Sequence, residues 1–261
     1  MTRQKRKTSE TGIYHVMLRG INRQVIFEDE SDYRKFLWLM NDLIMPKNEL
    51  GKIQPPKCIF YAYCLMPNHV HLLIQEKGET LTPVVHKLAT RYAIYYNNKY
   101  EHFGHLFQDR YKSEPVNDYV YFFTLLRYIH QNPIAGGLCR DAGAYEWSSW
   151  REYTGSPLCT SALCTVTSVL RRMPLEELQG LVDEPLPKTF RVLEFDNRGR
   201  SVTDEEVEAF LKTTYGIKPS DLQNYAKDRR DQILKAAKDY GASLRQLARL
   251  TSIGISIIRR A

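Results

Sequence analysis

Two histidines separated by one residue form the first group that could do chemistry. Side chains alternate between faces along a β-strand, so His69 and His71 of the string His69-Val70-His71 point to the same side. Two imidazoles on one face can chelate a divalent cation. The alternative is a pair of partly exposed histidines on a sheet that bind nothing.

A second group lies in the string Tyr128-Ile129-His130-Gln131-Asn132-Pro133. In a helix, Tyr128 and Asn132 lie one turn apart on one face, about 5–6 Å from each other. Two histidines and one amide oxygen would leave metal positions open for water or substrate oxygens. Such a set suits Mg²⁺ or Mn²⁺ better than a closed zinc site. The alternatives are a core tyrosine and an ordinary asparagine at a helix end.

The elements around these residues predict an α+β fold. The helix that carries Tyr128 is expected to end at Asn132, because a proline disfavours helix in the residue before it. The order of strands and helices is typical of a ferredoxin-like antiparallel sheet with helices on one face. The expected elements are a strand at 11–19, a helix at 32–45, strands at 57–65 and 69–75, a helix at 81–100, a loop into a strand at 105–116, and a helix at 118–132.

Charge and composition indicate a polyanionic partner. The chain of 261 residues has 37 Lys and Arg against 30 Asp and Glu, a net charge of +7 that is concentrated in the first 150 residues and at the C-terminal end. Five cysteines without a Cys-x-x-Cys pair disfavour a disulfide framework. With no signal peptide and no apolar run near ~20 residues, we expect a cytoplasmic, nucleoid-associated protein that does not bind membranes.

The pattern predicts three regions: residues 1–155, a linker region at 156–190, and a mainly α-helical C-terminal domain at 191–261. Residues 243–260 are spaced like a helix-turn-helix, with Ser243 as the first N-cap and Ser252 where a turn glycine is usual. We expect this motif to bind duplex DNA through Arg245, Arg259 and Arg260. The alternative is a small helical cap.

Taken in order, the motifs resemble a known family. Residues 61–73, which contain His69 and His71, look like the HUH motif of single-tyrosine transposases, in which U is an apolar residue. Residues 13–16 with 19–23 are similar to the family's first strand and turn, and residues 104–113 and 128–133 follow in the family's order. The resemblance covers roughly residues 8–155 and is strongest to the REP-associated tyrosine transposases.

The resemblance implies both a chemistry and its residues. His69, His71 and Asn132 would bind the divalent ion, and Tyr128 would attack a phosphodiester of single-stranded DNA. The product would be a 5′-phosphotyrosine link and a free 3′-hydroxyl, and the family's substrates are REP-like hairpins. Some relatives act as a homodimer that exchanges the tyrosine helix, and others act as monomers.

Basic and amide side chains near these motifs are the expected DNA contacts. Arg110 and Lys112 precede the tyrosine helix and are candidate phosphate clamps. Arg19, Asn22 and Arg23 are assigned to DNA binding from their place in the first turn of the family pattern.

Two other functions stay open at the level of sequence. A catalytically silent DNA-binding regulator would keep the fold, although it would not need all four candidate site residues. A metal-dependent nuclease that uses water would cleave DNA without Tyr128 and would never form a covalent link to it.

Overall fold

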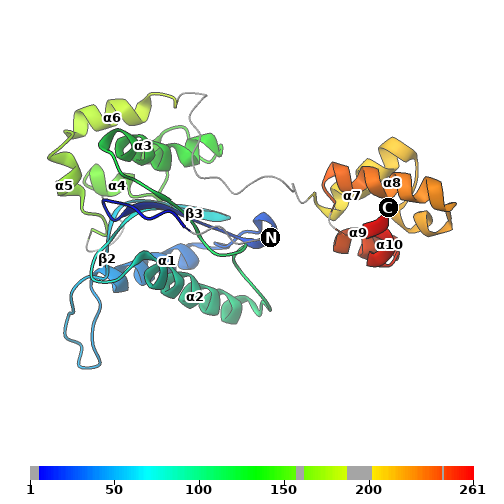
Figure 1. Ribbon diagram of the computed structural model, residues 1–261. Coiled ribbons are helices and arrows are strands. Elements are labelled where there is room, and N and C mark those ends of the chain that lie inside the picture. Colours follow the sequence, from blue (N-terminus) through cyan, green and yellow to red (C-terminus); the bar gives the residue numbers. More distant parts are fainter. Residues whose placement is uncertain (1–5, 157–161, 187–201, 243) are drawn as a thin grey trace. The chain divides into compact units, whose positions relative to one another are not determined.

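The computed structural model describes residues 6–156, 162–186, 202–242 and 244–261 (Figure 1). The chain divides into two compact units, Met1–Phe195 and Asp196–Ala261, and each unit is described by itself. None of the helices in the described ranges is both long and apolar enough to cross a membrane.

The first unit is built on a four-stranded antiparallel sheet. Its strands are β1 (Ile13–Arg19), β2 (Cys58–Met66), β3 (His69–Glu76) and β4 (Lys112–Pro115). Their order in the sheet is β2-β3-β1-β4, and a two-residue turn joins β2 to β3. This order, with helices α1 and α2 after β1 and β3, is the predicted ferredoxin-like arrangement, which is therefore confirmed.

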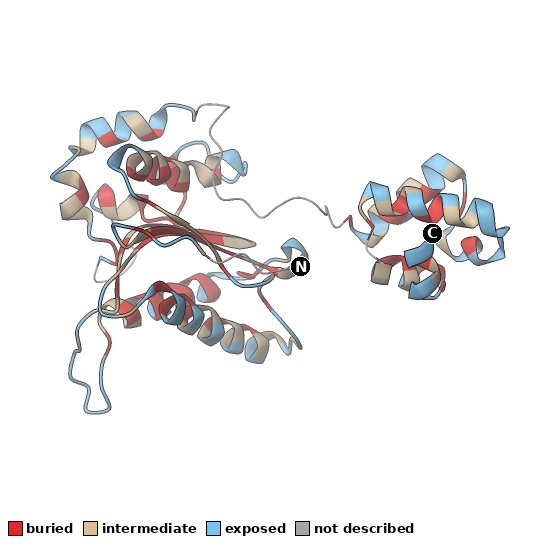
Figure 2. Cartoon of the chain, in the orientation of Figure 1, coloured by how far each residue is buried: buried red, intermediate tan, exposed pale blue. Residues whose placement is uncertain are grey.

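Helices cover both faces of this sheet, whereas the sequence predicted one covered face (Figure 2). Helices α1 (Glu30–Ile44) and α2 (Leu81–Tyr100) pack on one face, against side chains such as Leu72 and Ile74 of β3. Helix α3 (Tyr119–Ala135) packs on the opposite face, against Ala62, Cys64 and Leu73. The central strands are apolar at successive positions, and burying both of their faces requires a second layer of helices.

Helix α3 extends past the expected end at Asn132. Pro133 lies inside its last turn and is buried, and the helix ends at Ala135. A proline this close to the C-terminus removes only one helical hydrogen bond, and the N–H of Gly136 still reaches the carbonyl of Asn132 at 2.8 Å. Short elements η2 (Ala142–Ala144) and α4 (Trp150–Tyr153) continue the layer on this face.

Two helices lie within the range predicted as a linker. Helices α5 (Val166–Leu170) and α6 (Leu175–Asp183) belong to the first unit, and α6 packs on α3 (Figure 1). Leu178 and Val182 are buried in that contact. Their four-residue spacing makes one apolar stripe, which needs a partner surface.

The second unit is helical, as predicted for the C-terminal domain. Leu211, Ile233 and Leu247 are among the side chains that form its core. Ser252 adopts a left-handed backbone (φ 58) at the turn between the last two helices, the position where a glycine is usual. Its elements are α7 (Asp204–Tyr215), η3 (Pro219–Asn224), α8 (Lys227–Tyr240), α9 (Leu244–Thr251) and α10 (Ile255–Arg260). Ser243, the predicted N-cap of α9, lies outside the described residues.

Candidate active site

The structure brings His69, His71 and Tyr128 together between β3 and α3. The two histidine rings have centroids 5.0 Å apart and are nearly perpendicular. The Tyr128 ring lies edge-on to His71, with centroids 5.4 Å apart. The two-residue period of β3 turns both histidines toward α3, and the position of Tyr128 on α3 faces them.

Asn132 lies one helical turn beyond Tyr128, next to His69. Its side-chain amide donates to the carbonyl of Tyr128 at 2.9 Å. The same side chain also hydrogen-bonds His69, and this contact raises the pKa of that histidine against the larger effects that lower it. The four residues singled out by spacing therefore form one cluster.

Both histidines of the cluster are neutral at neutral pH. Burial, followed by the positive charge of Arg19, lowers the pKa of His69 to about 4. Burial lowers the pKa of His71 well below its ordinary value, and the neighbouring His69 and His15 lower it further. Neutral imidazole is the form that binds a metal ion.

His15 joins these four residues, although the sequence analysis assigned it no role. Its Nε2 lies 2.9 Å from Nδ1 of His71, and the two rings stack with centroids 5.2 Å apart. The side chain is fully buried, and burial lowers its pKa to about 3. A histidine inside an otherwise apolar central strand was the signal that could have identified it.

The nitrogens of the two candidate ligands fit a divalent metal. Nδ1 of His69 is bonded to Oδ1 of Asn68 at 2.6 Å, and Nδ1 of His71 is bonded to His15. Each ring is thereby oriented by one nitrogen, which leaves Nε2 as the possible ligand atom. No group of three or more His, Cys, Asp or Glu within the described ranges is placed to hold a metal. The donor set would therefore be two imidazoles and the amide oxygen of Asn132.

The turn before His69 is held by the loop that follows β1. Gly20 N–H donates to the carbonyl of Asn68 at 2.9 Å, and the Asn68 amide donates to the carbonyl of Arg23 at 3.2 Å. A Cβ on Gly20 would lie 2.3 Å from the carbonyl oxygen of Gln24, so this approach requires glycine. The loop and the turn thus form one rigid edge beside the histidines.

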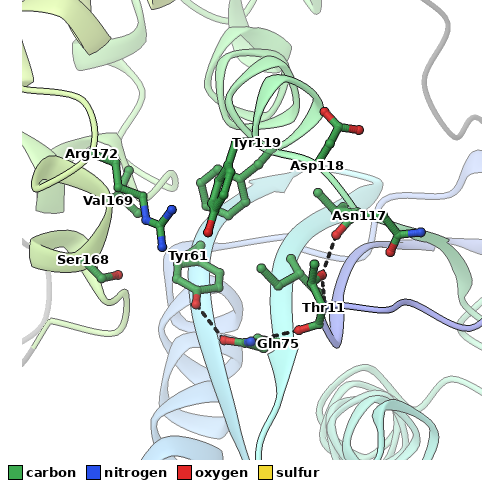
Figure 3. Close-up of a pocket in the computed structure, with 12 residues that line it drawn as sticks. Thr11, Tyr61, Gln75, Asn117, Asp118, Tyr119, Ser168, Val169 and Arg172 are labelled. Carbon is green, nitrogen blue, oxygen red and sulfur yellow. Dashed lines mark hydrogen bonds between the residues drawn. The ribbon is translucent and has the colours of Figure 1, made fainter.

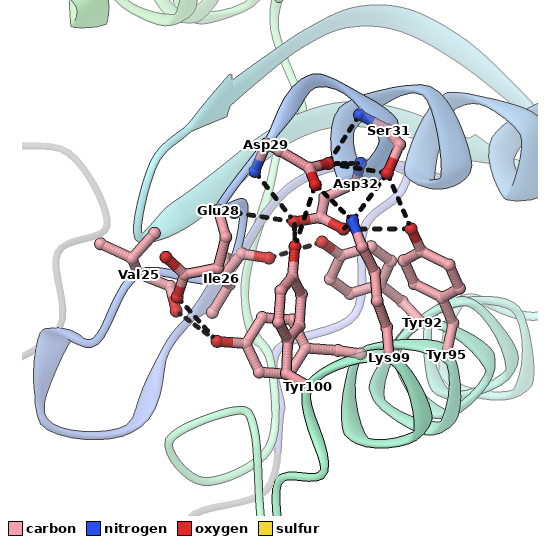
Figure 4. A network of polar contacts seen from close by, with 11 residues as sticks. Val25, Ile26, Glu28, Asp29, Ser31, Asp32, Tyr92, Tyr95, Lys99 and Tyr100 are labelled. Carbon is pink, nitrogen blue, oxygen red and sulfur yellow. Dashed lines mark hydrogen bonds and ion pairs between the residues drawn. The ribbon is translucent and has the colours of Figure 1, made fainter.

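A polar network fixes the other side of that loop (Figure 4). Lys99 at the end of α2 contacts the carboxylates of Asp29 at 2.7 Å and Asp32 at 2.8 Å. Tyr100 donates to Asp32 at 2.8 Å, and Tyr96 donates to Glu28 at 2.9 Å. Burial raises the pKa of Asp32, but the hydrogen bonds from Lys99 and Tyr100 outweigh it, and the net pKa is lowered. The network ties the start of α1 to the end of α2.

The predicted DNA-contact residues of the first unit lie at the same edge, with one exception. The charge of Arg19 acts on both histidines. Lys112 and His71 both pair with Met17, from opposite sides, so all three side chains share one face of the sheet. Asn22 and Arg23 are exposed, with left-handed backbone, in η1 (Ile21–Arg23). Arg110 is exposed and lies outside the strands, before β4.

The segment that runs from α5 to the residues just after α6 contacts α3 at two places. Near the first turn of α3, the Arg172 guanidinium lies 4.1 Å above the Tyr119 ring, at the mouth of a cavity of about 250 Å³ (Figure 3). Beside Tyr128, the Arg127 guanidinium donates to the carbonyl of Glu184 at 3.0 and 2.6 Å. Gln131 donates to the carbonyls of Val182 and Glu184, both at 2.5 Å.

A second cavity, of about 410 Å³, lies between α3 and the end of α6. Tyr128 and Asn132 form part of its wall, so it adjoins the cluster. The remaining wall comes from Gln131, Ile134, Ala135, Arg140, Asp141, Val182, Asp183, Pro185 and Leu186.

The predicted DNA-contact residues of the second unit are on its last two helices. Arg259 and Arg260 are exposed in α10, and Arg260 Nε donates to the carbonyl of Ser256 at 3.1 Å. Arg245 is in α9, and its side chain lies outside the described part of the chain.

Comparison with known proteins finds a family model that is similar to part of the first unit. Residues 8–132 match the family model of IS200-like transposases. This matched region contains His69, His71 and Tyr128 and ends at Asn132. No curated protein is significantly similar to the chain.

Two solved structures are similar to this chain. One is a REP-associated tyrosine transposase bound to a REP hairpin, with 12% sequence identity and a TM-score of 0.48, covering 59% of this chain and 86% of that one. The other is a crystal structure of a proposed transposase from Deinococcus radiodurans R1. It has 19% identity and a TM-score of 0.31, and it covers 50% of this chain and 97% of that one.

Proposed function

We propose that this DNA-processing enzyme cuts and rejoins single-stranded DNA through Tyr128. The observation that carries the proposal is the position of the Tyr128 ring, whose centroid lies 5.4 Å from that of His71. A candidate nucleophile thus lies directly beside the candidate metal-binding histidines. In a family of transposases, this pairing supports transesterification rather than hydrolysis.

In the proposed reaction, Tyr128 Oη forms a bond to phosphorus while the bond from phosphorus to the 3′-oxygen breaks. The phenolic proton is lost to water, and the departing oxygen gains a proton to become a free 3′-hydroxyl. The other DNA segment stays on Tyr128 as a 5′-phosphotyrosine. Attack by a second 3′-hydroxyl reverses the step and joins the strands, and the covalent link conserves the phosphodiester energy.

The chain's own residues set up this step. His69, His71 and Asn132 would hold Mg²⁺ or Mn²⁺, which when bound polarises the phosphate and stabilises the charge that develops on it. His15 and Asn68 orient the two imidazoles through Nδ1. A phenol with a pKa near ~10 is a weak nucleophile at neutral pH, so orientation against the phosphate is essential.

The proposed substrate is single-stranded DNA with a REP-like hairpin, and the basic edge around Arg19 and Lys112 would contact its phosphates. The second unit would bind duplex DNA as a helix-turn-helix. The left-handed Ser252 between α9 and α10 and the exposed Arg259 and Arg260 support this role.

A covalent-trapping assay tests the proposal. Labelled hairpin DNA from either side of the protein's own gene is incubated with the protein and Mg²⁺ or Mn²⁺, and is then run on a denaturing protein gel. We expect a labelled protein band that Tyr128→Phe abolishes and that Tyr121→Phe, a control on the same helix, retains. Cleavage without such a band would favour a nuclease that uses water. Binding without cleavage would favour a silent regulator.

A further inference from the structure

Tyr128 lies between the histidines on one side and the cavity next to α6 on the other. One side of its ring faces His71 and the basic edge that includes Arg19. Its other boundary is the cavity between α3 and α6. A phosphate held near the histidines would therefore be connected, through one sugar, to whatever occupies this cavity.

The cavity depends on a segment that the family match does not include. Val182, Asp183, Pro185 and Leu186 lie well beyond residue 132, where that match ends. Arg127 and Gln131, on either side of Tyr128 in sequence, bind the carbonyls of this segment. Helix α3, which lies beside α6 (Figure 1), thus carries the candidate nucleophile and also contacts the far wall of the cavity.

The lining of the cavity fits a nucleobase better than a phosphate. Two carboxylates, Asp141 and Asp183, would repel an anion, and Arg140 is the single cation among the described residues that line it. Ile134 and Leu186 offer apolar surface to the faces of a planar ring. Carboxylates accept hydrogen bonds from amino groups on base edges, as Asp and Glu do from cytosine N4.

We propose that this cavity binds the base of the nucleotide that follows the scissile phosphate, and that it selects a base with an exocyclic amino group. The inference rests on the proposed function, because that nucleotide is the one that stays attached to Tyr128. Adenine, cytosine and guanine carry such an amino group, whereas thymine does not. Binding this base would hold the strand that is linked to Tyr128 while the segment with the free 3′-hydroxyl leaves and a second 3′-hydroxyl takes its place.

The test uses the full chain and the strand whose cleavage position has been mapped by covalent trapping. One set of strands carries adenine, cytosine, guanine, thymine or an abasic site immediately after the cleaved phosphate. A control set carries an abasic site three nucleotides further downstream. At DNA concentrations below saturation, we expect the abasic strand to form the adduct about 5- to 150-fold more slowly, since stacking of one base on an aromatic side chain is worth ~1–3 kcal/mol.

A matched pair of variants tests the cavity itself. Asp183 lines the cavity and the adjacent exposed Glu184 does not, so Asp183→Asn and Glu184→Gln remove the same charge from neighbouring positions. We expect Asp183→Asn to lose the discrimination against thymine, and Glu184→Gln to keep it. Ala135→Leu, which fills the cavity, should slow the strand with a base more than the abasic strand.

The outcomes separate the inference from the proposed function. Adduct formation that does not depend on the base after the cleaved phosphate overturns the inference and leaves the function standing. So does a dependence only on the preceding base, or equal behaviour of Asp183→Asn and Glu184→Gln. If the wild-type protein forms no adduct on any strand, the proposed function fails and the inference fails with it.

Discussion

His15 is expected to control metal binding without being a ligand. The perturbation is His15→Phe, which keeps a ring of similar size in the strand and removes the nitrogen that contacts Nδ1 of His71. For Nε2 of His71 to bind a metal, Nδ1 must carry the proton and donate it to His15. Without that acceptor, His71 loses both its orientation and the partner of a buried N–H.

The structure sets the size of the effect. The two nitrogens are 2.9 Å apart, and the exposed fractions of His15 and His71 are 0% and 1%. Leaving a buried donor without a partner costs about 1–3 kcal/mol. Loss of the partner that orients a metal-binding histidine typically lowers metal affinity about 10–100-fold. We therefore expect the dissociation constant for Mn²⁺ to rise by about tenfold to a hundredfold.

Isothermal titration of the DNA-free protein with Mn²⁺ measures this constant directly, independently of cleavage. The matched control is His130→Phe, because His130 is also fully buried and its Nε2 bonds Ser149 Oγ at 2.8 Å, away from the cluster. Urea unfolding of both variants shows whether they lose similar stability. Wild-type Mn²⁺ affinity in His15→Phe, or an equal loss in His130→Phe, would refute the role assigned to the His15 contact.

Three further predictions concern stability and the second unit. Burial lowers the pKa of His130 to about 3, below the ordinary 6.5, so its contribution to stability is complete above pH 6.5 and is lost as the pH falls toward 3. At pH 5 the loss due to His130 is about 2 kcal/mol. Urea titrations should therefore show that the free energy of unfolding falls by about 2 kcal/mol less between pH 7 and pH 5 in His130→Leu than in the wild type, in which the other buried histidines also contribute. Lys99→Met should lower the free energy of unfolding by about 2 kcal/mol, because the fully buried carboxylate of Asp32 loses a charged partner, and an unchanged urea midpoint would contradict this. Replacing Arg259 and Arg260 together by alanine should weaken duplex binding. It should also reduce the slope of log affinity against log salt concentration by the contribution of up to two phosphate contacts, and an unchanged slope would argue against the helix-turn-helix role.

Local geometry allowed much of the site to be predicted from the sequence. The two-residue period of a strand places His69 and His71 on one face, and the helical turn places Asn132 beside Tyr128. The order of strands and helices indicated the ferredoxin-like sheet. These relations hold because backbone geometry fixes them over a few residues, whatever the rest of the chain does.

Only the tertiary structure decided which surfaces meet. Helix α3 covers the face of the sheet opposite α1 and α2, which brings Tyr128 to the histidines. His15 reaches His71 across the pairing of β1 with β3, and α6 reaches α3 from about 50 residues away. Such contacts depend on how apolar faces that are distant in sequence are buried together, and local spacing does not encode that choice.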